Sequence, residues 1–284
     1  MEHAGEADGK PDHAHDHDLP DRSFWQEYWQ DASLSAPDSL FHATLWRVLP
    51  HGEPLRFLEI GCTPGRGLVY FARRFGYRVT GLDYARLDLA RATLDRFGVE
   101  GDLIEADFTT YESGDRYDVV ASFGVLEHFP DPDRAIRRQA ALVARGGYLV
   151  VEMPNLRYAN GVLYRLFAPA LLRSHNLAAM DLGRLRAALG PEFEVLHARY
   201  AFTCALFFDA ANPLVARRPL VRTLVQALRW PLAHLGLDDI PSRFFSPYMM
   251  LIARRRPDAP GGADGTDQSG KERASGGRGG TSTR

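Results

Sequence analysis

Short apolar runs alternate with helical patterns along residues 55–154, and this alternation constrains the fold more than any other feature of the sequence. The apolar runs lie at residues 55–60, 78–83, 102–107, 117–123 and 148–153. The segments between them that repeat apolar residues at helical spacing lie at residues 68–75, 88–97 and 132–143. Strands that alternate with helices form β-α-β units, so the pattern predicts an α/β fold with a parallel sheet. A ligand is expected at the carboxyl edge of that sheet.

A glycine-rich turn follows the first of these runs. Residues 61–67 read GCTPGRG, and a helical pattern begins directly after them. A strand, a glycine turn and a helix bring backbone N–H groups and the start of a helix against a ligand. The spacing differs from the G-x-G-x-x-G of dinucleotide-binding proteins, and no Gly-Lys-Ser/Thr follows, as a phosphate-binding P-loop would require. Glu59, which precedes the turn, would repel a pyrophosphate and suits a positively charged ligand.

Three consecutive strands of the predicted sheet end in acidic residues, which are Glu59, Asp83 and Asp107. Asp83 lies 22 residues beyond Gly61, and an acid at the tip of the second strand can accept hydrogen bonds from both hydroxyls of a ribose. Acids at three strand ends indicate that the glycine turn belongs to a site for a nucleoside-like ligand. The alternative is a glycine turn with a structural role only.

Five motifs follow one another between residues 57 and 155. They read EIGCTPGRG from residue 59, GLDYA from 81, EADF from 105, YDVVASFGVLEHFPDP from 117 and GGYLVVEMPN from 146. In this order they resemble class I S-adenosylmethionine-dependent methyltransferases, in particular the small-molecule branch related to ubiquinone-biosynthesis O-methyltransferases. The resemblance implies a Rossmann-like, doubly wound sheet of seven strands, mostly parallel, with helical lid insertions. Two late apolar runs, at residues 193–202 and 248–254, would form its antiparallel C-terminal pair.

The resemblance also implies S-adenosylmethionine as the cofactor. The ten residues that it places against this cofactor are, in chain order, Glu59, Gly61, Gly65, Gly67, Asp83, Tyr84, Asp107, Phe108, Ser122 and Phe123. The glycines would let the turn pass close to the methionine moiety, and Glu59 would face its ammonium group. Asp83 would hold the ribose hydroxyls, and Tyr84 would lie beside the adenine. Asp107 would accept a hydrogen bond from the adenine amino group, and Phe108 would pack on the adenine ring. The last two residues of the list would face the sulfonium.

The implied activity is methyl transfer to a small molecule, to oxygen in preference to nitrogen or carbon. Methyl transfer mainly requires that the nucleophile, the methyl group and the sulfur lie in line. In favourable cases such orientation lowers the activation barrier by about 7–11 kcal/mol. A hydroxyl nucleophile also gains from a base, and His128 is the candidate because imidazole titrates near neutrality. Alternatively, Glu127 and His128 only shape the turn before the helix that starts near Pro132. His175, which follows an inserted segment, is a weaker candidate.

Other functions remain as alternatives. An intact cofactor half is also compatible with a non-catalytic S-adenosylmethionine-binding or scaffold protein, and less readily with an NAD-dependent oxidoreductase. Nucleic-acid substrates are disfavoured, because the fourth strand is followed by neither the Asp/Asn-Pro-Pro-aromatic box of adenine-N6 enzymes nor the Pro-Cys of cytosine-C5 enzymes. The formal net charge of −2 gives no sign of a nucleic-acid surface either.

The ends of the chain differ in composition from its centre. Residues 1–22 hold seven acidic residues against two basic ones, and residues 257–284 are rich in glycine and serine, so we expect both to be disordered. Four histidines in the first segment, His3, His13, His15 and His17, could chelate a divalent ion, but no flanking apolar residues fix a geometry and we predict no metal site. One methyltransferase domain is expected at residues 23–256, with insertions at 156–176 and 213–237.

Substrate specificity is expected to come from segments outside residues 57–155, which carry the cofactor motifs. The aromatic residues 24–29 would form a helix over the cleft, and residues 156–176 a lid. Residues 213–237 interleave arginines with apolar residues and Trp230, which suggests peripheral contact with a membrane or with a hydrophobic, anionic substrate. Packing on the domain or a homo-oligomer contact is the alternative.

Two cysteines and no apolar run of about 18 residues leave the cytoplasm as the expected location.

Overall fold

The computed structural model describes residues 19–30, 39–167, 169–202, 223, 227, 231, 234, 235 and 240–257. Three segments therefore lie wholly or mostly outside the described residues. They are the N-terminal segment with its four histidines, residues 257–284 and residues 213–237. The predictions of disorder, of no metal site, of membrane contact and of oligomer contact fall on these segments and stay predictions, except at the end of the N-terminal segment, where residues 19–22 are described and Arg22 begins a helix. Among the described residues, no helix is both long and apolar enough to cross a membrane.

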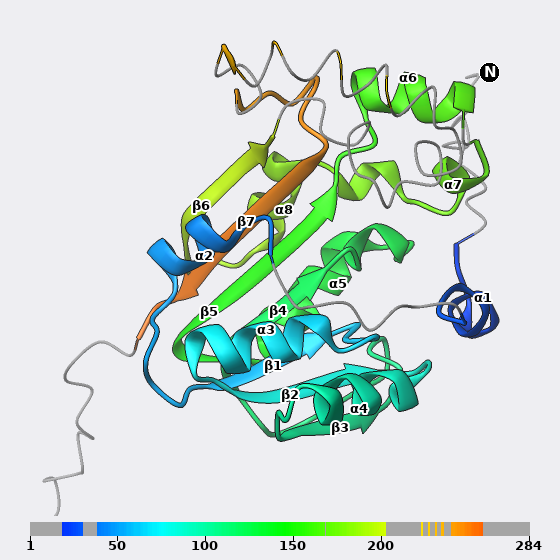
Figure 1. The fold of residues 1–284 in the computed structure, drawn as a ribbon. Helices are drawn as coiled ribbons and strands as arrows, with labels where there is room; N and C mark the ends of the chain where they lie inside the picture. Colours follow the sequence, from blue (N-terminus) through cyan, green and yellow to red (C-terminus); the bar gives the residue numbers. More distant parts are fainter. Residues whose placement is uncertain are drawn as a thin grey trace, which may run out of the picture.

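A seven-stranded sheet forms the centre of the fold (Figure 1). Its strands are β1 (Arg56–Ile60), β2 (Arg78–Asp83), β3 (Gly101–Glu105), β4 (Tyr117–Phe123), β5 (Val143–Pro154), β6 (Phe193–Ala201) and β7 (Tyr248–Arg255). Their order in space is β3-β2-β1-β4-β5-β7-β6, and β7 runs antiparallel to both of its neighbours, while the other pairs are parallel. The fold class predicted from the alternation is confirmed. The strand order reverses between β1 and β4, and ligands of open α/β sheets bind at such a point.

Helices cover both faces of this sheet. They are α1 (Arg22–Tyr28), α2 (His42–Val48), α3 (Arg66–Phe75), α4 (Leu87–Arg96), α5 (Pro132–Ala141), α6 (Tyr158–Phe167), α7 (Pro169–Arg173) and α8 (Leu182–Ala188), with short 3-10 turns η1 (Leu126–His128) and η2 (Leu177–Ala179). One buried apolar cluster joins the sheet to α2, α3 and α4, and a second joins it to α5 and α8. Each strand therefore points alternate side chains into two separate cores.

The start of β5 differs from the prediction. The strand begins at Val143, five residues before the predicted start at Tyr148, and α5 ends earlier, at Ala141. Gly146 and Gly147 fall between the predicted helix, which ends at residue 143, and the predicted strand, which begins at residue 148. Instead they lie within β5, where Gly146 has φ +78° and the β4–β5 register shifts between Tyr117 and Val119. Glycine at positive φ permits this irregularity inside the strand without ending it.

The segment predicted as a lid at residues 156–176 is partly built into the domain. Tyr164 of α6 is 3% exposed and packs in the core, and Asn155 and Asn160 each donate a side-chain hydrogen bond to the carbonyl oxygen of Ser246 beside β7. Only the end of the segment, around His175, reaches the cavity described below. A lid role for that end stays a prediction.

Candidate active site

The turn between β1 and α3 brings Glu59 against Gly67. Glu59 is the fourth residue of β1, and its carboxylate lies so close to Gly67 that a side chain at residue 67 would overlap with it. Gly61 has φ +71°, and a Cβ there would lie 2.7 Å from Cγ2 of Val125. Both glycines are thus required by close approach, as the glycine-rich sequence predicted.

Glu59 is buried and incompletely paired. The residue is 5% exposed, and its Oε2 has no hydrogen-bond partner among the described residues. Burial, with a smaller contribution from the nearby Asp83, raises the pKa of Glu59 from its ordinary value of 4.5 to about 8. A buried carboxyl without a partner is unfavourable, and a cationic ligand would supply the missing interaction.

The acids after β2 and β3 each close a turn. The Asp83 carboxylate accepts hydrogen bonds from the backbone N–H groups of Tyr84 at 2.7 Å, Ala85 at 3.0 Å and Thr63 at 3.0 Å. Asp107 accepts from the backbone N–H and the hydroxyl of Thr109, both at 2.7 Å through Oδ1. An ionised carboxylate offers about four acceptor positions, so both groups keep capacity for ligand hydroxyl or amino groups.

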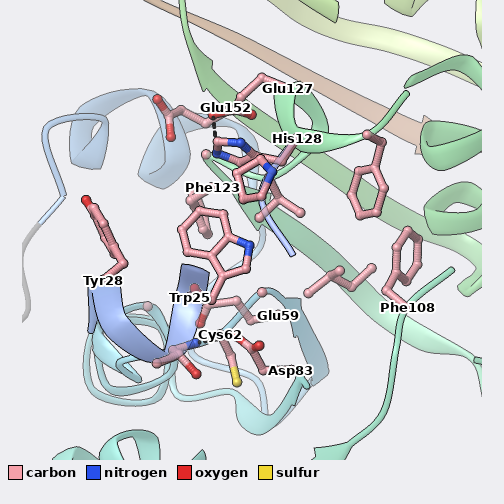
Figure 2. A pocket seen from close by; sticks show the side chains of 18 of the residues that line it. Trp25, Tyr28, Glu59, Cys62, Asp83, Phe108, Phe123, Glu127, His128 and Glu152 are labelled. Carbon is pink, nitrogen blue, oxygen red and sulfur yellow. Dashed lines mark hydrogen bonds and ion pairs between the residues drawn. The ribbon is translucent and has the colours of Figure 1, made fainter. Parts of the chain in front are cut away.

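One cavity of about 1460 Å³ joins these residues to the end of β4 (Figure 2). The predicted cofactor contacts that line it are Glu59, Gly61, Gly67, Asp83, Tyr84, Asp107, Phe108 and Phe123. We call this side of the cavity, from Glu59 to Phe108, the glycine-turn end. The opposite side, which we call the histidine end, is lined by Trp25, Glu127, His128, Glu152 and His175, and Phe123 lies between the two.

Two predicted contacts, Gly65 and Ser122, are not among the cavity-lining residues. Gly65 has φ +93° and lies against the backbone of Ala90 in α4, where a Cβ would be 3.0 Å from its Cα. Ser122 is fully buried on the other face of β4 and donates a hydrogen bond of 3.0 Å to Oε1 of Gln139 in α5. Because side chains alternate along a strand, Ser122 and Phe123 cannot both face the cavity.

His128 lies at the histidine end with its tautomer defined. Its Nδ1 is 3.0 Å from the carbonyl oxygen of Ser174, and a carbonyl can only accept, so Nδ1 carries the proton and Nε2 presents a lone pair. Burial, with a smaller contribution from His175, lowers the pKa of His128 from 6.5 to about 3. The ring is therefore neutral at physiological pH. Trp25 of α1 packs edge-on against it at 4.9 Å between ring centroids.

His175 has a similar arrangement. Its Nδ1 donates to the carbonyl oxygen of Leu171 at 2.7 Å, and its ring centroid is 4.6 Å from that of His128. Burial lowers the pKa of His175 as well. Glu127, His128 and His175 bring one oxygen or nitrogen atom each within 4.8 Å of one another. Such a group could converge on a divalent ion, but its free Nε2 atoms and carboxyl oxygens equally suit hydrogen bonds with an organic ligand.

Two carboxyl groups at the histidine end had no assigned ligand role in the sequence analysis. Glu152 lies in β5 directly opposite Phe123 of β4, so both side chains face the same side of the sheet. Glu127 is 1% exposed and follows β4 within η1. Alternation along the fifth strand gives a signal for Glu152, because an acid inside an otherwise apolar run stands out.

A family model described as "Methyltransferase domain" matches residues 28–198. Among curated relatives, the ubiquinone biosynthesis O-methyltransferase of Alkalilimnicola ehrlichii is 35% identical over 107 residues, which cover 36% of this chain and 43% of that protein. The enzyme of the same name from Stutzerimonas stutzeri is 40% identical over 104 residues, covering 35% of this chain and 44% of that protein. The matched segment thus spans less than half the length of either relative.

Solved structures share the fold at low identity. A methyltransferase from Geobacter sulfurreducens, in complex with S-adenosyl-L-homocysteine, is 18% identical with a TM-score of 0.51, over 84% of this chain and 99% of that one. Coclaurine N-methyltransferase is 12% identical with a TM-score of 0.52, over 76% of this chain and 72% of that one. The family model covers more than half of the 284 residues. The chain belongs to the family of methyltransferase domains.

Proposed function

We propose that the protein transfers the methyl group of S-adenosylmethionine to an oxygen atom of a small molecule. The observation that carries the proposal is one cavity in which Glu59, a buried carboxyl with one unpaired oxygen, lies at one end and the neutral imidazole of His128 lies at the other. The first group suits the ammonium of the methionine moiety. The second suits a hydroxyl that must lose its proton.

The glycine-turn end offers a donor set that fits the cofactor. Glu59 would pair with the ammonium group, and Asp83 would accept from a ribose hydroxyl through Oδ2 while it keeps its three backbone hydrogen bonds. Asp107 and Phe108 would hold the adenine, the first through Oδ2, for which no other hydrogen bond is described, and the second through its ring. When bound, S-adenosylmethionine supplies an electrophilic methyl group on a positively charged sulfur.

His128 would take the proton from the acceptor hydroxyl. Nε2 accepts the proton while Nδ1–H stays bonded to the Ser174 carbonyl oxygen, which holds the ring in place. The low pKa of His128 keeps Nε2 unprotonated at neutral pH, and it also makes the ring a weaker base than an ordinary imidazole, so proton transfer requires that a ligand or a neighbouring carboxylate stabilise the imidazolium. General base catalysis of this kind contributes about 10²- to 10⁴-fold. Trp25 and Phe123 flank the position and would limit the access of water.

The test is a transfer assay with S-adenosylmethionine that carries a labelled methyl group and a bacterial metabolite extract. We expect label in a small organic product, and we expect His128→Ala to lower turnover about 10²- to 10⁴-fold without changing the affinity for S-adenosylhomocysteine. His51→Ala, at an exposed position, is the matched control. Unchanged turnover in His128→Ala would make His128 structural. Cofactor binding without any labelled product would favour a scaffold role.

A further inference from the structure

The histidine end contains two buried carboxyl groups that the proposed reaction does not use. Glu127 is 1% exposed and Glu152 is 9% exposed, and both line the cavity. They are separate from Glu59, because Glu152 lies on β5 and β4 stands between β5 and β1. Strands are spaced about 4.8 Å apart, so this places the two strands about 10 Å from each other.

Neither carboxyl has a cationic partner. Oε2 of Glu127 has no hydrogen-bond partner, and no arginine among the described residues forms an ion pair with Glu127 or Glu152. Two imidazoles near Glu127 could become positive: His128, with Nε2 3.9 Å from Oε1, and His175, which has a ring nitrogen within 4.8 Å of the carboxyl, but burial lowers the pKa of both rings and favours their neutral form. A buried carboxyl is costly when it is unpaired, so its orientation toward a cavity indicates a ligand that pairs with it.

The electrostatics of the cavity favour a cation. Six carboxyl groups line it, against two guanidinium groups, those of Arg22 and Arg66. Burial raises the pKa of Glu152 to about 8, and burial together with the nearby Glu152 raises the pKa of Glu127. At neutral pH these two carboxyls thus hold protons that a cationic ligand would displace. Trp25 at the histidine end and Phe123 between the two ends offer aromatic faces to a cation.

We propose that Glu127 and Glu152 bind a basic nitrogen of the acceptor, so that the substrate is a small organic amine that also carries the hydroxyl to be methylated. The inference rests on the proposed function, because it places the amine beside His128 in the half of the cavity opposite the cofactor. The ammonium group lies between the two carboxylates, and the hydroxyl lies at Nε2 of His128. Each carboxyl releases its proton as the cation enters.

The test compares two probes that match in shape and differ in charge, benzylamine and benzyl alcohol. Their affinities for the full chain, saturated with S-adenosylhomocysteine at pH 7.5, are measured by ligand-observed NMR. A chelator is present, so that no divalent ion occupies the carboxyl–imidazole group. We expect benzylamine to bind about tenfold more tightly than benzyl alcohol, the size of effect typical of hydrogen bonds to charged groups.

Variants assign this preference to the two carboxyls. Glu152→Gln and Glu127→Gln keep the side-chain volume and should each reduce the preference for benzylamine, and the double variant should abolish it. Glu112→Gln, at an exposed position, is the control and should keep the preference. Equal binding of the two probes, no binding of either, or a preference retained in the double variant would overturn the inference alone. Failure of wild-type protein to bind S-adenosylhomocysteine would overturn it together with the proposed function.

Discussion

Glu59 is buried near the end of β1, and one of its carboxylate oxygens is unpaired. Cofactor binding is therefore coupled to the release of a proton from this carboxyl. Below its pKa of about 8 the carboxyl is protonated, and pairing with an ammonium group requires that the proton leave. We therefore expect the affinity for S-adenosylhomocysteine to rise from pH 6 to pH 8, by up to about tenfold per unit, and then to level off. Isothermal titration calorimetry across this range measures the slope.

Glu59→Gln should bind S-adenosylhomocysteine more weakly at pH 8 and with little dependence on pH. Glu53→Gln, an exposed acid just before the same strand, should retain the wild-type slope. A steep slope that persists in Glu59→Gln would show that another group releases the proton.

A substitution at Gly67 tests the close contact between this residue and the Glu59 carboxylate. Gly67→Ala places a methyl group into the Glu59 carboxylate, and overpacking of this kind destabilises a core by about 1–3 kcal/mol. We expect this loss in urea denaturation, with weaker binding of S-adenosylhomocysteine. Gly114→Ala is the matched control, because nothing lies within 4 Å of its Cβ. Equal stability of the two variants would mean that Glu59 moves away easily.

The sequence places three strand-end acids together, because parallel strands end at one edge of the sheet, and all three line the cavity. Glu59, Asp83 and Asp107 could be found in this way. Ser122 was misplaced because motif position alone ignores alternation, which sends it to the α5 face. His175 reaches the site through a turn that follows α7, a placement set by tertiary packing that no local pattern encodes.

At the scale of elements, α1 covers the cavity with little attachment to the body of the protein. The helix contains no buried residue, and its described links are the contact of Trp25 with His128 and an exposed ion pair between Arg22 and Glu105. Exposed ion pairs contribute about 0–1 kcal/mol, so the helix adds little to stability. Its position over the histidine end agrees with the predicted aromatic helix.

Trp25→Ala should therefore separate stability from function. We expect only a small fall in the melting temperature, since Trp25 is half-buried and its helix contains no buried residue. The KM for the acceptor should rise severalfold, because one side of the acceptor position is lost. Leu196→Ala, at a position 41% exposed on β6, is the control. An unchanged KM would leave α1 without a role in acceptor binding.

The order of strands and helices could be predicted, whereas several boundaries could not. Hydrophobic patterning predicted the first five strands and the family resemblance implied the last two, but β5 continues through Gly146, where a register shift accommodates glycines that resemble a turn in sequence. Residues 156–176 have the composition of a lid, yet Tyr164 packs in the core. Composition does not distinguish a covering segment from a packed one, because both present an apolar face.

At the scale of the whole molecule, the buried carboxyls make stability depend on pH. Glu59 and Glu152 have pKa values raised to about 8, so the folded state binds more protons than the unfolded state between about pH 4.5 and 8. Stability therefore falls as pH rises through this window. The lowered pKa values of His128 and His175 act below about pH 6.5, where they reduce stability as pH falls.

We expect the unliganded protein to be most stable near pH 6 and to lose stability from pH 6.5 to 8 in urea denaturation. Glu152→Gln should flatten the loss, because the amide has no proton to release, while Glu112→Gln should not. Stability that increases from pH 6.5 to 8 would contradict the burial of these carboxyls in their protonated form.

The central claim is that the cavity holds S-adenosylmethionine through the acids at the strand ends. Calorimetric titration of the full chain with S-adenosylhomocysteine, and separately with NAD, tests it most directly. We expect one molecule of S-adenosylhomocysteine per chain, no binding of NAD, and affinity about tenfold or more weaker in Asp83→Ala, provided that circular dichroism shows the variant folded. No heat with S-adenosylhomocysteine, or affinity unchanged in the folded Asp83→Ala variant, would contradict the claim.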